Sequence, residues 1–413
     1  GRMFAVRSEP ALASDRMLTA SQKYGVLCQS DFVEMEGRRV VEVIMGKESL
    51  KHVEPDDFII SMRSFQGGIE WCKLRGSTSF HYVMLRPVKG VYPPFFAHLF
   101  KSATYIQALR TTTDLIRDGQ ELRYSNFVQV DLPLVPIDEQ TQIATFLDRE
   151  TAKIDALVAE QLRLMDLLKE KRQAVISHAV TRGLNPDAPM KASGVEWLGD
   201  VPAHWRVGKC GFYLSILSGF AFPSTGFSDD ESDMRLLRGI NVGVSRLKWN
   251  ETVYWRRSPG DGLDVYEMRE GDLVIGMDRP LISEGIRVAK VRETDLPCLL
   301  LQRVASLKTG GQLDPDYLLG LLSSEMFVAH FAPETTGVSV PHISPEQINN
   351  FVIPIPPVVE QEAIVAFVGR ETAKFDTLTT EAQRAIDLLQ ERRTALISAA
   401  VTGQIDVREA LAA

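Results

Sequence analysis

The stretch EQTQIATFLDRETAKIDALVAEQLRLMDLLKEKRQAVISHAVT, from Glu139 to Thr181, decides the fold because the chain contains it twice. From Glu360 to Thr402 the sequence reads EQEAIVAFVGRETAKFDTLTTEAQRAIDLLQERRTALISAAVT. The two copies align without a gap at a constant offset of 221 residues, and 24 of the 43 aligned positions are identical. Identity at this level indicates an internal repeat with a long period.

Both copies have the composition and periodicity of a long helix. Neither contains proline, and apolar residues recur every seven positions over more than four heptads, a pattern typical of a coiled coil. Asp138 is expected to cap the first helix, whereas Val359 stands at the matching position of the second. Gly183 and Gly403 follow the two helices, where a left-handed residue ends a helix. The expected interface residues are Leu147, Ile154, Leu157, Leu164, Leu168 and Val175 in the first copy, and Val368, Phe375, Leu378, Leu389 and Leu396 in the second.

Two nearly identical helices in one chain favour each other as partners. The residues between them form a whole domain and can return the chain in either direction. We expect intramolecular, antiparallel pairing, with Leu157 and Leu378 buried between the helices.

The remaining sequence forms two globular blocks, so the plan is globule, helix, globule, helix. In the first block we expect strands over 39–44, 58–62 and 81–85 and a helix over 94–109, which gives a mixed α/β fold. The second block repeats the apolar pattern of the first but differs in polar residues. The expected segments are 1–138 for the first globule, 139–183 for the first helix, 184–359 for the second globule, 360–404 for the second helix and 405–413 for a tail.

The length of the first block differs from that of the second. The second block contains Trp197-Leu-Gly-Asp-Val-Pro202, which has no counterpart in the first, and it is longer by about 25 residues. We expect either that this piece is missing from the first globule or that the first globule begins differently.

Composition and charge fit a multidomain globular protein. The chain has 413 residues, 45% of them hydrophobic, a formal net charge of −8 and a pI of about 5.5. No apolar run has the length of a membrane span, and the four cysteines lie far apart, so a reducing cytoplasm fits. The negative charge counts against nucleic acid as a partner unless basic residues gather on one face.

Motifs for chemistry are absent from the sequence. There is no G-x-x-x-x-G-K-[ST] phosphate loop, no G-x-G-x-x-G, no H-E-x-x-H and no methyltransferase Pro-Pro-Tyr or Pro-Pro-Phe preceded by Asn or Asp. Asp314-Pro-Asp-Tyr317 is read as a helix cap, and His81 and His342 as core or loop residues. No metal site and no catalytic residue is expected, so a binding or scaffold protein is the favoured class.

Four motifs carry a resemblance to a known family. P-L-V-P-x-x-E-Q at 133–140, P-I-P-P-x-x-E-Q at 354–361 and the paired RETAK-x-D segments resemble the conserved regions of specificity subunits of type I restriction–modification enzymes. GVEWLGDVPAHW at 194–205 resembles the entry to one of that family's target recognition domains. The resemblance covers essentially the whole chain. It implies two α/β target recognition domains separated by an antiparallel coiled coil of two long helices, with pseudo-two-fold symmetry.

The resemblance also implies a function and partners. The chain would give sequence specificity to a multisubunit enzyme without catalysing a reaction itself, by reading a bipartite, asymmetric site on double-stranded DNA. Its partners would be two adenine-specific methyltransferase subunits, which bind S-adenosylmethionine, and motor–nuclease subunits, which use ATP. The chain itself would bind no cofactor.

If DNA is the ligand, base edges and phosphates require Arg, Asn, Gln, Ser or Lys on loops. Arg63 and Arg279, at corresponding loop positions, form the strongest pair of candidates. The full set is Lys23, Tyr24, Arg63, Ser64, Gln66 and Tyr82 in the first globule, and Arg238, Asn241, Arg279, Ser283 and Arg303 in the second.

Two other classes of function remain open. A coiled-coil scaffold with two protein-binding globules and no DNA role agrees with the acidic pI. An enzyme with an unrecognised site is the weakest alternative.

Overall fold

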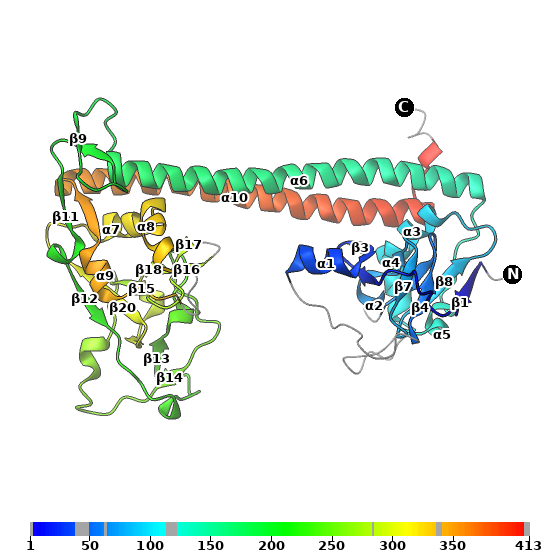
Figure 1. Ribbon diagram of the computed structural model, residues 1–413, viewed down its shortest axis with the longest axis horizontal. Helices are drawn as coiled ribbons and strands as arrows, with labels where there is room; N and C mark the ends of the chain where they lie inside the picture. The colour runs from blue at the N-terminus through cyan, green and yellow to red at the C-terminus, as the bar shows by residue number, and fades with distance from the viewer. Residues whose placement is uncertain are drawn as a thin grey trace. The chain divides into compact units, whose positions relative to one another are not determined.

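The computed structural model describes residues 3–37, 49–61, 64–112, 122–282, 285–335 and 341–408. Two compact units divide the chain: unit 1 comprises Gly1–Arg163 and Ala382–Ala413, and unit 2 comprises Leu164–Glu381. Each unit therefore contains one globule together with part of both long helices, α6 (Ile137–Arg182) and α10 (Val358–Val401) (Figure 1).

The globule of unit 1 is mixed α/β. Its main sheet is antiparallel, with strand order β1-β8-β5-β6, and the pairs β2-β3 and β4-β7 form two small ribbons beside it. The elements are β1 (Phe4–Arg7), β2 (Leu18–Ser21), β3 (Gly25–Cys28), α1 (Gln29–Glu36), β4 (Lys51–Val53), β5 (Phe58–Ile60), α2 (Ser64–Gly67), β6 (Glu70–Trp71), β7 (Gly76–Thr78), β8 (Val83–Pro87), α3 (Pro93–Lys101), α4 (Ala103–Arg110) and α5 (Tyr124–Phe127).

The globule of unit 2 has a matching four-stranded sheet, with order β12-β20-β15-β18, and four smaller sheets. Its strands are β9 (Met190–Ala192), β10 (Asp200–Pro202), β11 (Arg206–Lys209), β12 (Leu214–Ser218), β13 (Met234–Leu237), β14 (Tyr254–Trp255), β15 (Leu273–Gly276), β16 (Leu281–Ile282), β17 (Gly285–Ile286), β18 (Val288–Lys290), β19 (Cys298–Leu300), β20 (Val304–Thr309) and β21 (Val352–Ile355). Its helices are α7 (Pro315–Leu322), α8 (Glu325–Thr335) and α9 (Pro345–Asn350), with short 3-10 helices at Cys210–Phe212, Ser224–Gly226, Gly239–Asn241, Leu263–Tyr266 and Glu293–Asp295.

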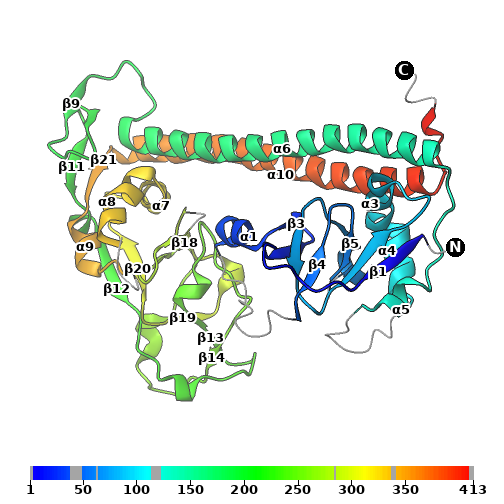
Figure 2. The same ribbon diagram turned by 45° about the vertical axis from the view of Figure 1, so that its right-hand side comes forward.

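The register of the main sheets shows that the two globules are built alike. Phe58 pairs with Leu85 in unit 1, and Leu273 pairs with Leu307 in unit 2, both antiparallel. A broken helix follows each sheet, α3 with α4 and α7 with α8. In both views α7 and α8 lie between the sheet of unit 2 and the long helices (Figures 1 and 2).

The core of each unit includes side chains from the long helices. In unit 1 a cluster of phenylalanines, among them Phe4, Phe58 and Phe100, packs in edge-to-face and tilted pairs, and Leu147 and Ala400 join the same core. Offset and edge-to-face ring pairs stabilise a core beyond the area that they bury.

Unit 2 is organised in the same way. The fully buried Trp205 and Tyr317 pack with Ile176 and Val180 of α6 and with Ile364 of α10. The ends of the long helices are thus part of the globular cores.

Several expected elements are found and others need correction. The strand expected over 58–62 is β5, and the strand expected over 81–85 is β8, which begins two residues later. The single helix expected over 94–109 is two helices, because Ser102 breaks the first and caps the second by accepting a hydrogen bond from the Tyr105 amide at 3.2 Å. The strand expected over 39–44 lies outside the described residues.

The helix ends also test the sequence signals. Asp314 caps α7 as expected, accepting hydrogen bonds from the amides of Asp316 and Tyr317. Gly183 and Gly403 adopt φ values of 77° and 73°, the left-handed conformation expected at a helix end. Asp138 is not the cap, because α6 already begins at Ile137.

Candidate nucleic-acid interface

The glutamine of each repeated Glu-Gln pair fastens its globule to a long helix. Gln140 is fully buried, accepts a hydrogen bond from the Tyr92 amide at 2.8 Å, and donates to the carbonyls of Gly90 at 2.9 Å and Val135 at 2.7 Å. A buried amide that is satisfied in this way holds both backbone segments, since losing it would leave their polar groups without partners.

Gln361 makes the same three bonds in unit 2. It accepts from the Asp314 amide at 2.8 Å and donates to the carbonyls of Gln312 at 2.9 Å and Pro356 at 2.8 Å. The repeated sequence therefore encodes a repeated contact.

The two long helices contact each other through equivalent ion pairs in the two units. Arg393 of α10 donates to Asp155 of α6 at 2.9 Å in unit 1, and Arg172 of α6 lies 3.6 Å from Asp376 of α10 in unit 2. The 221-residue offset converts one pair into the other. Within each unit the segments of α6 and α10 run in opposite directions (Figure 1).

Burial along α6 follows a heptad pattern that differs from the expected one. Leu147, Ile154 and Leu168 are buried as expected, and Val175 is partly buried. The second row of inward positions comes four residues after the first rather than three, so Val158, Met165 and Arg172 turn inward.

The expectation for three leucines is therefore wrong. Leu157, Leu164 and Leu378 are 52%, 41% and 45% exposed. On α10, Thr379 takes the inward position that had been assigned to Leu378. Of the remaining α10 residues, Phe375 is buried, and Val368, Leu389 and Leu396 are partly buried.

Two of the exposed leucines of α6 have a leucine at the matching position of α10. Leu157 and Leu378 correspond by the 221-residue offset, and so do Leu167 and Leu388, which are 52% and 56% exposed. Each unit thus exposes one leucine of each pair.

Three of the six candidate DNA contacts of unit 1 are bound to other groups. Lys23 and Tyr24 both contact Glu36, at 3.2 Å and 2.8 Å, and the Lys23 ammonium lies 4.6 Å from the Tyr24 ring centre. Ser64 is buried and accepts a hydrogen bond from the Ser61 amide at 2.8 Å, a placement that does not fit a base contact. Tyr82 is half-buried against the core. Arg63 and the side chain of Gln66 lie outside the described residues.

The unit 2 candidates fall into two groups. Asn241 is buried and bonds the Arg238 amide and the Lys248 carbonyl, so it shapes a turn and does not face solvent. Arg238 donates to the Glu251 carbonyl. Arg279 and Arg303 are exposed, at adjacent strand ends. Ser283 lies outside the described residues.

The structural register corrects the expected correspondence of Arg63 with Arg279. Because Phe58 matches Leu273 in the two sheets, Arg279 corresponds to Ser64, and Arg63 corresponds to Asp278. The globules therefore differ in chemistry at the end of this strand.

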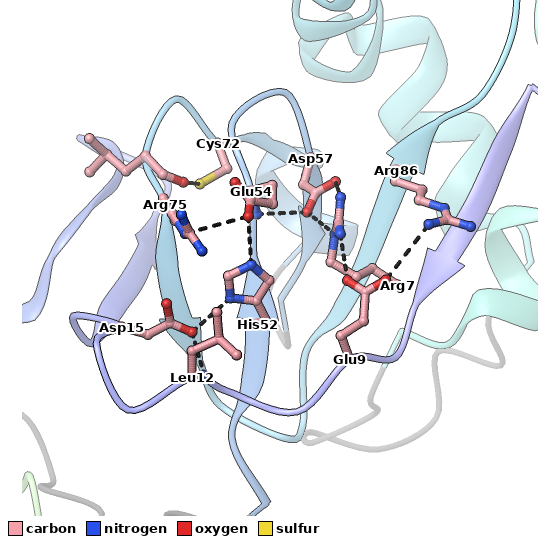
Figure 3. A network of polar contacts seen from close by, with 11 residues as sticks. Arg7, Glu9, Leu12, Asp15, His52, Glu54, Asp57, Cys72, Arg75 and Arg86 are labelled. Carbon is pink, nitrogen blue, oxygen red and sulfur yellow. Dashed lines mark hydrogen bonds and ion pairs between the residues drawn. The ribbon is translucent and has the colours of Figure 1, made fainter.

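Unit 1 contains a polar network around His52 that was not predicted from the sequence (Figure 3). His52 is buried, with its Nδ1 2.7 Å from Asp15 and its Nε2 2.8 Å from Glu54. Arg7 joins the same network through Asp57 at 2.6 Å. Burial acts to lower the pKa of His52, but the hydrogen bonds and charges of Asp15 and Glu54 outweigh it, and the pKa is raised. These contacts tie the N-terminal segment to β4 and β5.

The described residues were compared with the requirements of a metal site and of a reactive thiol. They contain no group of three or more His, Cys, Asp or Glu side chains that could hold a metal ion. Burial raises the pKa of Cys72 to about 11 and those of Cys210 and Cys298 to about 12, so these thiols stay protonated and are poor nucleophiles. None of the helices in the described ranges combines the length and apolar content needed to cross a bilayer.

Comparison with known proteins confirms the resemblance carried by the repeated motifs. No protein-family model matches the chain. The type I restriction enzyme MjaVIII specificity subunit of Methanocaldococcus jannaschii is 27% identical over 286 residues, which are 68% of this chain and 64% of that protein. The EcoAI specificity subunit of Escherichia coli is 33% identical over 168 residues, 40% of this chain and 28% of that protein. The EcoKI specificity subunit of Escherichia coli K12 is 25% identical over 378 residues, 87% of this chain and 76% of that protein.

The matched regions span less than two thirds of the length of the first two of these relatives. In three dimensions the chain resembles one from a solved structure concerned with complex assembly and conformational transition of a type I R-M system. The TM-score is 0.67 at 16% identity, over 96% of this chain and 91% of that chain. Likeness at this identity shows that the fold is shared.

Proposed function

We propose that this chain is the DNA sequence-specificity subunit of a type I restriction–modification complex. The observation that carries the proposal is the pair of equivalent fastenings, Gln140 with Asp155–Arg393 in unit 1 and Gln361 with Arg172–Asp376 in unit 2. The long helices and their glutamine contacts are alike in the two units, whereas the globule surfaces differ. At the matching strand ends, for example, unit 1 has the buried Ser64 and unit 2 has the exposed Arg279. Two equivalent helix attachments that carry two different globules suit a DNA site with two unlike halves.

The two halves of the site follow from the repeat. Two-fold readers place their half-sites on successive turns of DNA, roughly 34–36 Å apart, and leave the sequence between them unread. We expect the two long helices to pair antiparallel and separate the globules, so that each globule reads one half-site. The site is then bipartite and asymmetric in sequence, and phosphate contacts make its binding depend steeply on salt.

The partners would supply the chemistry. Two adenine-methylating subunits that bind S-adenosylmethionine would dock alike, and the repeat-related leucines Leu157 with Leu378 and Leu167 with Leu388 offer them equivalent apolar surfaces. Each subunit would flip one adenine out of the duplex. Motor–nuclease subunits that use ATP would complete the complex, and the chain described here would hold no catalytic group and no cofactor.

The net charge of −8 favours a second candidate function, a scaffold whose globules bind proteins. A gel-shift experiment separates the two. The chain is co-purified with the methylating subunit proposed as its partner and mixed with a pool of random DNA duplexes. The proposal predicts enrichment of one gapped motif and loss of binding between about 50 and 200 mM salt. A complex that retains no duplex at either salt concentration would leave the scaffold as the better description.

A further inference from the structure

Two arginines in unit 2 occupy backbone conformations that arginine rarely adopts. Arg279 has φ 45° and Arg303 has φ 71°, both in the left-handed region. This conformation costs free energy for any residue with a β-carbon, and Gly, Asn or Asp usually fills it. Arg303 lies in the tight turn between β19 and β20, where glycine would remove the strain. Retained strain of this kind is a reason to look for a function of the side chain.

The two strained residues belong to one small region. The Met277 amide bonds the Arg303 carbonyl at 2.9 Å, the Arg279 amide bonds the Pro341 carbonyl at 2.7 Å, and the Ile343 amide bonds the Met277 carbonyl at 2.9 Å. Three segments that are distant in sequence therefore meet at the end of β15. The side chains of both arginines are exposed there.

Asp278 lies at the centre of this region. Its Oδ1 accepts a hydrogen bond from Nη1 of Arg303 at 3.1 Å and lies 2.7 Å from Nδ1 of His342. The Arg303 side chain is 60% exposed and that of Asp278 is 29% exposed, so the guanidinium is held on one side and open to solvent on the other. An exposed ion pair of this kind contributes little to stability, which leaves its position as the feature to be explained.

We infer that Asp278 is a positioning residue that holds the Arg303 guanidinium for base recognition in the second half-site, with Arg279 as a neighbouring contact. This inference rests on the proposed function. A guanidinium reads guanine through a fixed two-pronged geometry, and a side chain already held in place loses less conformational freedom on binding. The negative charge of Asp278 also weakens attraction to phosphates in general, so it favours discrimination over affinity.

The first globule differs at this point. By the strand register, the sequence position matching Asp278 is Arg63, which lies outside the described residues, and the position matching Arg279 is the buried Ser64. Because the sequence has an arginine in unit 1 where unit 2 has Asp278, changing Asp278 should alter only one half-site.

The test begins from the methylation motif of the wild-type complex, found by long-read sequencing, and measures binding to duplexes with single mismatches in each half-site. Asp278→Asn should bind non-specific DNA more tightly, while its discrimination at one position of one half-site falls by about tenfold, within the range of one bidentate base contact. Discrimination in the other half-site should not change. The control is Asp230→Asn, which removes the same charge from a carboxylate that is also paired with an arginine, Arg256, and lies away from β15.

Two variants of Arg303 separate a reading role from a structural one. Arg303→Lys keeps the charge and should lose the same discrimination. Arg303→Gly relieves the left-handed strain and should raise the unfolding midpoint of the chain while it also loses discrimination. A gapped wild-type motif with unchanged discrimination in Asp278→Asn and Arg303→Lys would overturn the inference and leave the proposed function standing. Absence of any gapped motif in the wild type would overturn both.

Discussion

Single buried polar residues show how closely the two units correspond. Gln140 and Gln361 each accept one backbone bond and donate two, from equivalent positions to equivalent partners. Each glutamine lies at the start of a long helix and holds the loop that precedes the first helix of the broken pair. The glutamine adds a specific polar contact to the apolar packing between globule and helix, and the same contact is present in both units.

The His52 network predicts a pH-dependent fastening of the N-terminal segment in unit 1. Donation to both Asp15 and Glu54 requires the protonated ring, and the pKa of His52 is raised above its usual value of 6.5. A group whose pKa is raised in the folded state stabilises fully below its unfolded pKa, and loses this contribution as pH rises through the folded value.

Hydrogen exchange in the peptides containing Leu12 and Lys51–Val53 measures this effect. Protection in the wild type should fall as pH rises above about 6.5, after correction for the intrinsic exchange rate. In His52→Gln, protection should be lower at pH 6 and flat over the same range, and peptides of unit 2 serve as an internal control. Equal pH dependence in wild type and variant would show that the ring is not the titrating group.

At the scale of the element, the heptad register makes Ile154 and Leu157 opposite in character. Ile154 is 6% exposed and Leu157 is 52% exposed, although they are separated by only three residues on α6. Ile154→Ala should lower the free energy of unfolding by about 2–5 kcal/mol, because it leaves a cavity between packed side chains.

Leu157→Ala is the matched control, and it should change stability by less than about 0.5 kcal/mol. It should instead weaken retention of the methylating subunit in co-purification, and more so when combined with the repeat-related Leu378→Ala. Chemical denaturation and size-exclusion chromatography measure the two effects. Destabilisation of the isolated chain by Leu157→Ala would restore the original register.

The contrast between these residues also shows what sequence reasoning could reach. The repeat, the long helices and their glycine ends were predictable because the two copies are similar in sequence and their apolar residues recur at regular spacing. The second row of inward positions was not predictable, since a heptad allows that row to lie either three or four residues after the first. The leucines favoured a step of three, whereas the structure has a step of four. Arg63 was aligned with Arg279 because both are arginines, whereas the strand pairing shifts the alignment by one residue, so that Ser64 corresponds to Arg279. The contact between Asp278 and His342 joins segments more than sixty residues apart in the chain. No local sequence pattern predicts such a contact.

At the scale of the whole molecule, the proposed function requires repeated long helices that carry two globules with different DNA-binding surfaces. The residues of the long helices obey the 221-residue offset, while the strand-end residues of the globules do not. Replacing the second globule, residues 190–353, by that of a relative should therefore change one half-site and keep the other. This behaviour distinguishes a modular reader from a single contiguous interface.

Long-read methylation mapping in cells that carry this chain and its methylating partner tests the central claim most directly. The account predicts two short specific half-sites separated by a fixed unread gap, with one methylated adenine in each half-site on opposite strands, and a chimera of residues 190–353 that alters one half-site alone. A single contiguous motif, or no methylated motif in cells where both proteins are present and associated, would contradict it.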